Sequence, residues 1–131
     1  IFEIISRLKK KSCKIRLPNQ YVTDEDLPAI YSGAVAFVYP SIYEGFGIPP
    51  LEAMACGVPV ICADNSSLPE AVGKAAIMVD ALSVDDISSA MTKLLTDTTL
   101  QATLVKKGTE QVKNFSWDAS AKKLLESIRQ L

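Results

Sequence analysis

The chain has 131 residues, of which 48% are hydrophobic and 22% are charged, and its 14 basic and 15 acidic residues leave a net charge of -1. A chain of this length forms one domain and can bury a single core. A net charge so close to zero provides no field to attract DNA, RNA or an anionic membrane, so nucleic acid is not an expected partner.

The cysteines and the hydropathy pattern limit the compartment. Cys13, Cys56 and Cys62 are an odd number of thiols in apolar surroundings, and the sequence contains no histidine to complete a zinc site. No apolar run reaches the roughly 18 residues that span a bilayer. We therefore expect reduced, buried thiols, no metal site and no membrane span in a cytoplasmic protein.

The first predicted elements are a helix, a strand and a second helix. Apolar residues at helical spacing predict a helix over 1–11, and alternation predicts a strand over 13–17. Thr23 and Asp26 resemble a capping box, which predicts a helix that stops near Gly33.

Three apolar runs farther along the chain predict strands of a parallel sheet. They cover residues 35–39, 58–63 and 75–79, and the first is expected to be buried on both faces at the centre of the sheet. Pro49 and Pro50 predict a helix over 49–56, and a capping box of Ser67 and Glu70 predicts a helix over 67–73.

The C-terminal part is predicted to be helical, with Ser83, Thr98 and Ser116 as the N-caps of three helices. Strands that alternate with helices predict an α/β fold with a doubly wound, Rossmann-like parallel sheet. We assign residues 1–131 to one domain. Because the sequence opens at Ile1 within an amphipathic pattern, we expect it to be part of a larger protein.

The loop over residues 41–48 is the first candidate site. In an open parallel sheet, ligands bind outside the carboxyl ends of the strands, where this loop is expected to lie. Gly45 and Gly47 allow a ligand to approach the backbone, and the N-terminus of the next helix favours an anion. Pro50 stands where G-x-G-x-x-G needs its third glycine, so the loop is no standard NAD or ATP motif.

Two glutamates follow the predicted central strand. Glu52 is the only charge in residues 48–56, which predicts a buried carboxylate that needs donors from protein or ligand. A solvated glutamate on the one wet face of the helix is an equal alternative. Most loop glutamates are solvated, but the position of Glu44 just past a strand favours a functional role. Phe46 in the same loop is more often a lid on the core.

The run over residues 44–61, preceded by Pro40-Ser41, closely resembles the E-x(7)-E signature of the large group 1 family of retaining GT-B glycosyltransferases, which includes many bacterial mannosyl- and glucosyltransferases. The resemblance extends to residues 22–27, 66–73 and 115–117, and so covers nearly the whole chain. It implies the C-terminal, donor-binding domain of such an enzyme, acting in glycan, glycolipid or polysaccharide biosynthesis.

The resemblance also implies roles for single residues. Glu44 would bind hydroxyls of the donor sugar and be important for catalysis, Ile48 N–H would face the distal phosphate, and Glu52 would accept from the ribose hydroxyls. The implied donor-binding residues are Glu44, Gly45, Phe46, Gly47, Ile48, Leu51 and Glu52. The implied ligand is a nucleotide-diphosphate sugar, such as a GDP- or UDP-hexose, with no metal and no further cofactor.

Relatives begin this domain with a further strand and with an Arg and a Lys that clamp the diphosphate, and neither feature precedes Ile1. The resemblance therefore implies that the first strand and the acceptor domain lie outside this sequence, along with any peripheral membrane contact. We expect residues 1–131 to fold alone but to transfer no sugar. Many relatives also have a glycine where this chain has Pro18-Asn19-Gln20, so the loop that faces the base differs.

Two alternatives belong to other functional classes. One is a non-catalytic nucleotide-sugar-binding or regulatory module of the same fold, although the presence of both Glu44 and Glu52 favours the enzyme. The other is a free-standing flavodoxin-like interaction domain, in which the spacing of the glutamates would be accidental.

Overall fold

The structure is a computed structural model that describes residues 14–16 and 21–130. The helix predicted over 1–11 lies outside the described residues. Of the strand predicted over 13–17, the described residues Lys14–Arg16 do not form a strand. Alternation is only a weak signal for a strand, because a strand is stable where a neighbouring strand completes its hydrogen bonds and its side chains pack.

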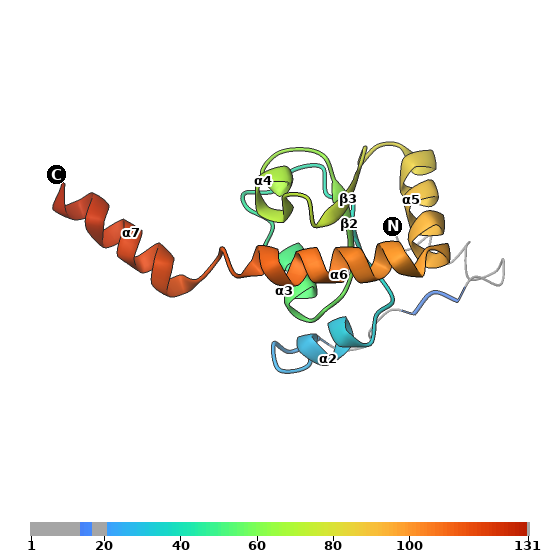
Figure 1. The fold of residues 1–131 in the computed structure, drawn as a ribbon, viewed down its shortest axis with the longest axis horizontal. Coiled ribbons are helices and arrows are strands. Elements are labelled where there is room, and N and C mark those ends of the chain that lie inside the picture. Colours follow the sequence, from blue (N-terminus) through green and yellow to red (C-terminus); the bar gives the residue numbers. More distant parts are fainter. Residues whose placement is uncertain (1–13, 17–20, 131) are drawn as a thin grey trace.

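The described strands form one parallel sheet in the order β1 (Phe37–Tyr39), β2 (Val60–Ala63), β3 (Ala76–Val79), as Figure 1 shows in part. Every residue of β2 is buried, whereas the residues of β1 are half-buried. The prediction that residues 35–39 form the central strand is wrong for the described sheet. β2 is central there because β1 and β3 pair with its two edges.

Helices cover both faces of the sheet, which confirms the predicted doubly wound α/β fold. The core on one face contains Val60 and Cys62 of β2 with residues of α3 (Ile48–Ala55) and α4 (Leu68–Val72). The core on the other face contains Ile61 with residues of α5 (Val84–Thr96). Successive residues of a strand point to opposite faces, so β2 contributes to both cores.

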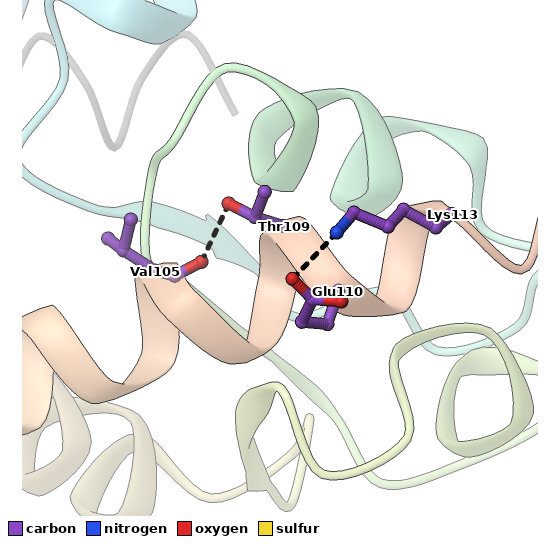
Figure 2. A network of polar contacts seen from close by, with 4 residues as sticks. All are labelled: Val105, Thr109, Glu110 and Lys113. Atoms are coloured by element: carbon purple, nitrogen blue, oxygen red, sulfur yellow. Dashed lines mark hydrogen bonds and ion pairs between the residues drawn. The ribbon is translucent and has the colours of Figure 1, made fainter.

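Helix α6 (Thr98–Val112) packs with both cores. Its buried Leu104 packs in the core that contains α5, and its buried Gly108 faces Met54 of α3 so closely that an added Cβ would lie 3.0 Å from Met54 Cγ. The opposite face of α6 is polar, and Figure 2 shows the exposed pair in which Lys113 Nζ lies 2.7 Å from Glu110 Oε1. An exposed pair of this kind adds little stability, so burial holds α6 in place.

Helix α7 (Trp117–Arg129) extends away from the body of the molecule in Figure 1, and none of its residues is buried. No helix in the described part of the chain is long and apolar enough to cross a membrane.

The predicted helix starts agree with the structure where a side chain caps the helix. Ser83 accepts from Asp86 N–H at 3.1 Å and Ser116 accepts from Ala119 N–H at 3.1 Å, as predicted. The N-cap of α6 is Asp97, which accepts from Leu100 N–H at 2.8 Å. The predicted N-cap, Thr98, is therefore wrong by one position. Aspartate is a better N-cap than threonine, which agrees with Asp97 as the cap of α6.

Two predicted capping boxes are absent. Thr23 Oγ1 donates to Asp26 Oδ2 at 3.1 Å instead of capping, and helix α2 (Leu27–Ser32) begins later, with a proline in its first turn. The Ser67 side chain does not cap α4. Its hydroxyl donates to a carbonyl of the β1 loop instead, as described below.

The described cysteines are free thiols. Cys62 is buried and reduced as predicted, and burial raises its pKa to about 11, which makes the thiol unreactive. Cys56 is only half-buried, because it ends α3, where the chain turns through Gly57 at φ 74°. The expectation of a fully buried thiol is therefore wrong for Cys56. Cys13 lies outside the described residues.

Candidate functional site

The loops that follow β1 and β2 meet at the carboxyl edge of the sheet and are joined by hydrogen bonds. Asn65 Nδ2 donates to Ser41 C=O at 3.1 Å, and Ser67 Oγ donates to Glu44 C=O at 3.0 Å. Glu44 N–H donates to Ser66 Oγ at 3.1 Å. The backbone of Glu44 is therefore fixed at both its N–H and its C=O, at the edge where ligands bind in open α/β sheets.

The Glu44 carboxylate is held through one oxygen. Tyr39 Oη donates to Oε1 at 2.6 Å, and Ser41 Oγ donates to the same oxygen at 2.8 Å. No described residue donates to Oε2. The bond from Tyr39, followed by that from Ser41, lowers the pKa of Glu44, and the same bond and burial raise the pKa of Tyr39 to about 12. Glu44 is therefore a fixed anion with one oxygen left to accept from a ligand.

We expect Tyr39→Phe to raise the pKa of Glu44 towards the ordinary glutamate value. The substitution removes the donor that favours the charged carboxylate most. A pH titration of the Glu44 side-chain carbon signal by NMR measures this. In the unaltered protein the folded-state pKa is lowered, so this bond stabilises the fold above the unfolded value of about 4.3 and the gain is lost as the pH falls through the folded-state pKa. An unchanged midpoint in Tyr39→Phe would contradict the bond.

Glu52 lies on the exposed face of α3 with Ile48, whereas Leu51 and Met54 are buried. The prediction of a buried carboxylate is wrong, because α2, which packs against α3, leaves the Glu52 side chain exposed. Glu52 is not simply solvated either, since Tyr31 Oη of α2 donates to its Oε2 at 3.1 Å. No described residue donates to its Oε1.

The two glycines of the loop differ in their surroundings. Gly47 is buried at φ 101°, and an added Cβ would lie 2.6 Å from Leu68 Cδ2. A Cβ at Gly45 would meet nothing within 4 Å. Gly47 is thus required by the fold, and Gly45 is the position where the backbone is open to a ligand.

The N-terminus of α3 offers fewer donors than a helix of ordinary sequence. Pro49 and Pro50 follow Ile48 in its first turn, and proline has no backbone N–H. The backbone N–H of Ile48 is therefore the main donor for an anion in that turn, beside an exposed Ile48 side chain.

An apolar hollow of about 470 Å³ adjoins the loop. The Phe46 ring, 39% exposed, packs edge to face against Phe115 with ring centroids 5.5 Å apart. Phe46 therefore lies over the link to α7 and is neither a full core residue nor fully exposed. Leu51 lines the same hollow but is only 8% exposed, so its side chain belongs mainly to the core.

Several residues of the site were not singled out from the sequence. They are the hydroxyl and amide groups of Tyr31, Tyr39, Ser41, Asn65, Ser66 and Ser67, which donate to the site except for Ser66, whose oxygen accepts from Glu44 N–H. Polar residues directly after two adjacent parallel strands are a signal that was available for the loop residues, because such loops share one edge of the sheet. The two tyrosines carried no such signal, since their bonds to carboxylates depend on side-chain geometry.

The described residues contain no group of three or more side chains suited to hold a metal ion. Asp24 and Asp26 do form an Asp-x-Asp pair in the exposed turn before α2, a pattern that was not singled out from the sequence, and Thr23 donates to Asp26. The absence of a metal requirement stays a prediction, which assays with and without EDTA test.

Together, the described elements define a doubly wound, Rossmann-like α/β domain with two hydrogen-bonded carboxylates, Glu44 and Glu52, on the loop and helix that follow β1. Comparison with known families makes this more specific. The family model described as "Glycosyl transferases group 1" matches residues 13–111. The chain belongs to the group 1 glycosyltransferase family.

Curated relatives agree with this family. The chain is 51% identical over 98 residues to an O-antigen chain mannosyltransferase B of Escherichia coli. The aligned segment covers 75% of this chain and 26% of that protein. It is 40% identical over 112 residues to a D-inositol 3-phosphate glycosyltransferase of Salinispora arenicola. This aligned segment covers 84% of this chain and 25% of the relative. The chain thus spans about a quarter of the length of these two proteins.

Solved structures share the fold. Sucrose-phosphate synthase from Thermosynechococcus elongatus superposes with a TM-score of 0.84 at 31% identity, over 98% of this chain and 33% of that one. The C-terminal domain of a group 1 glycosyl transferase, LpcC, from Francisella tularensis superposes with a TM-score of 0.74 at 24% identity, over 86% of this chain and 60% of that one. The fold predicted from the sequence is therefore also that of glycosyltransferase domains.

Proposed function

We propose that this domain binds a nucleotide-diphosphate sugar as the donor half of a retaining glycosyltransferase that moves a hexose to an acceptor. The observation that carries the proposal is the state of Glu44. Its backbone and one carboxylate oxygen are fixed at the carboxyl edge of the sheet, and its second oxygen has no donor among the described residues. Such an anion is suited to accept hydrogen bonds from sugar hydroxyls.

The second glutamate supports the same assignment. Glu52 stands eight positions after Glu44, on the exposed face of the helix that the Glu44 loop enters. In the proposed complex, Glu44 accepts from the donor sugar and Glu52 from the ribose diol, and the diphosphate lies at Ile48 N–H between them. The identity to a mannosyltransferase makes a nucleotide-linked mannose the first donor to test.

The chemistry of the reaction assigns a purpose to these contacts. Transfer breaks the bond between the anomeric carbon and the diphosphate oxygen and forms a bond from that carbon to an acceptor hydroxyl oxygen, whose proton is released. Negative charge therefore grows on the leaving diphosphate while positive charge grows on the sugar ring. Donors such as Ile48 N–H stabilise the first charge, and the Glu44 anion beside the ring stabilises the second. The acceptor and further phosphate-binding groups come from outside residues 1–131 in this proposal.

We expect Glu52→Ala in the full-length protein to weaken binding of the nucleoside diphosphate by about 1.5 to 3 kcal/mol, the usual range for hydrogen bonds to a charged group. Calorimetric titration with GDP and UDP measures this. Glu70→Ala is the matched control, because Glu70 is an exposed glutamate on α4. Equal affinity of Glu52→Ala and the unaltered protein would defeat the proposed ribose contact.

A further inference from the structure

Both glutamates of the proposed donor site are held by a tyrosine hydroxyl. Tyr31 Oη donates to Glu52 at 3.1 Å, and Tyr39 Oη donates to Glu44 at 2.6 Å. Each tyrosine bonds a single oxygen of its carboxylate, and the second oxygen receives no donor from the described residues. A carboxylate held in this way keeps the lone pairs of its second oxygen, but loses rotamer freedom.

The two tyrosines belong to one row of packed rings. Phe37 packs edge to face with Tyr31, with centroids 5.4 Å apart, and stacks on Tyr39, with centroids 5.7 Å apart. Phe37 and Tyr39 belong to β1, and Tyr31 belongs to α2. The row therefore connects a helix to the edge of the sheet and fixes both hydroxyls relative to the same strand.

We propose that Tyr31, Phe37 and Tyr39, the aromatic row, position Glu52 and Glu44 so that each presents its second oxygen to the donor. The inference rests on the proposed function. Tyr31 and Tyr39 are positioning residues, since they act through the carboxylates and do not touch the ligand themselves. Tyr31 acts on the nucleotide end of the donor, and Tyr39 acts on the sugar end.

The physical reason is the cost of fixing a flexible side chain. A glutamate on an exposed helix face samples several rotamers, and a ligand that needs one of them must exclude the rest on binding. A hydroxyl bond that already selects the rotamer removes this cost. Phenylalanine in place of either tyrosine keeps the ring in the row and removes only the hydroxyl.

The alternative is that Tyr31 affects the ligand through the packing of α2 and not through its bond to Glu52. Such an effect would persist when Glu52 is removed. A positioning residue acts only through Glu52, so its effect vanishes when Glu52 is removed.

The test uses the full-length protein and GDP and UDP as probes, titrated calorimetrically into Tyr31→Phe, Glu52→Ala and the double variant. We expect Tyr31→Phe to raise the Kd of the bound nucleotide about fivefold in the unaltered background, and to leave it unchanged in the Glu52→Ala background. Tyr39→Phe should leave the Kd of the nucleotide unchanged and lower kcat/KM for transfer from the nucleotide sugar about fivefold. Tyr43→Phe is the matched control in the loop, because Tyr43 is 80% exposed.

Each other outcome has a definite meaning. If Glu52→Ala weakens binding but Tyr31→Phe does not, or if Tyr31→Phe weakens it equally in both backgrounds, the positioning role is overturned and the proposed function stands. Loss of nucleotide affinity in Tyr39→Phe would overturn the division between the two ends. If neither GDP nor UDP binds, the proposed function fails and the inference fails with it. If Glu52→Ala has no effect, the proposed ribose contact and the role of Tyr31 both fail, while the assignment of Glu44 is not affected.

Discussion

Glu44→Gln in the full-length protein is expected to lower kcat/KM for sugar transfer by about 100-fold, which corresponds to roughly 3 kcal/mol of transition-state stabilisation. The reason lies in Tyr39 and Ser41, which both donate to the same carboxylate oxygen of Glu44. In the variant, the amide oxygen is the only group able to accept from them, so it takes that position. The amide nitrogen then faces the ligand and donates where the carboxylate accepted.

The isosteric change leaves the structural contacts of the residue in place. The backbone of Glu44 keeps its bonds with Ser66 and Ser67, so the loop should hold its position. Affinity for the nucleoside diphosphate, which lacks the sugar, should match that of the unaltered protein. Steady-state kinetics and calorimetry together measure the expected pattern. Transfer at the unaltered rate would remove Glu44 from the proposed mechanism.

The fold class could be predicted from the sequence, because the signals for strands and helix starts lie within short segments. Continuous apolar runs marked β2 and β3, and caps such as Ser83 and Ser116 marked helix starts to the residue. The order of strands was not local information. Residues 35–39 carry the composition of a buried strand, yet β1 is an edge strand in the described sheet, because pairing depends on neighbours that composition does not reveal.

The position of the candidate residues in the fold was predictable, but their contacts were not. The E-x(7)-E resemblance and the rule for open parallel sheets placed the candidate residues on the β1 loop and α3, where the structure has them. The prediction that Glu52 is buried was wrong, because an apolar helix is buried only where other elements cover it. The hydroxyl of Ser67 was assigned to a helix cap, but it bonds Glu44, 23 positions away, and such tertiary bonds leave no local signature.

The two loop glycines give the last expected result, for which Gly47→Ala and Gly45→Ala are a matched pair in the full-length protein. Gly47→Ala should destabilise the region around the loop by about 2 to 5 kcal/mol. A left-handed backbone costs an alanine roughly 1 to 2 kcal/mol, and forcing a methyl into a packed core costs a further 1 to 3 kcal/mol or so. Both costs apply at Gly47, because its φ is 101° and an added methyl carbon would lie 2.6 Å from Leu68 Cδ2.

Gly45→Ala isolates the effect of a methyl group on the ligand. Its Cβ has no neighbour within 4 Å, so the stability should change by no more than about 0.5 kcal/mol. If the donor approaches the backbone there, the methyl group will weaken donor binding while the fold is unaffected. Hydrogen–deuterium exchange of peptides covering residues 41–52 and 66–73 measures the local stability, and calorimetry with the nucleotide sugar measures binding. Equal protection of these peptides in Gly47→Ala and Gly45→Ala would show that Leu68 yields to the methyl group, and that the left-handed turn into α3 is not what fixes the loop.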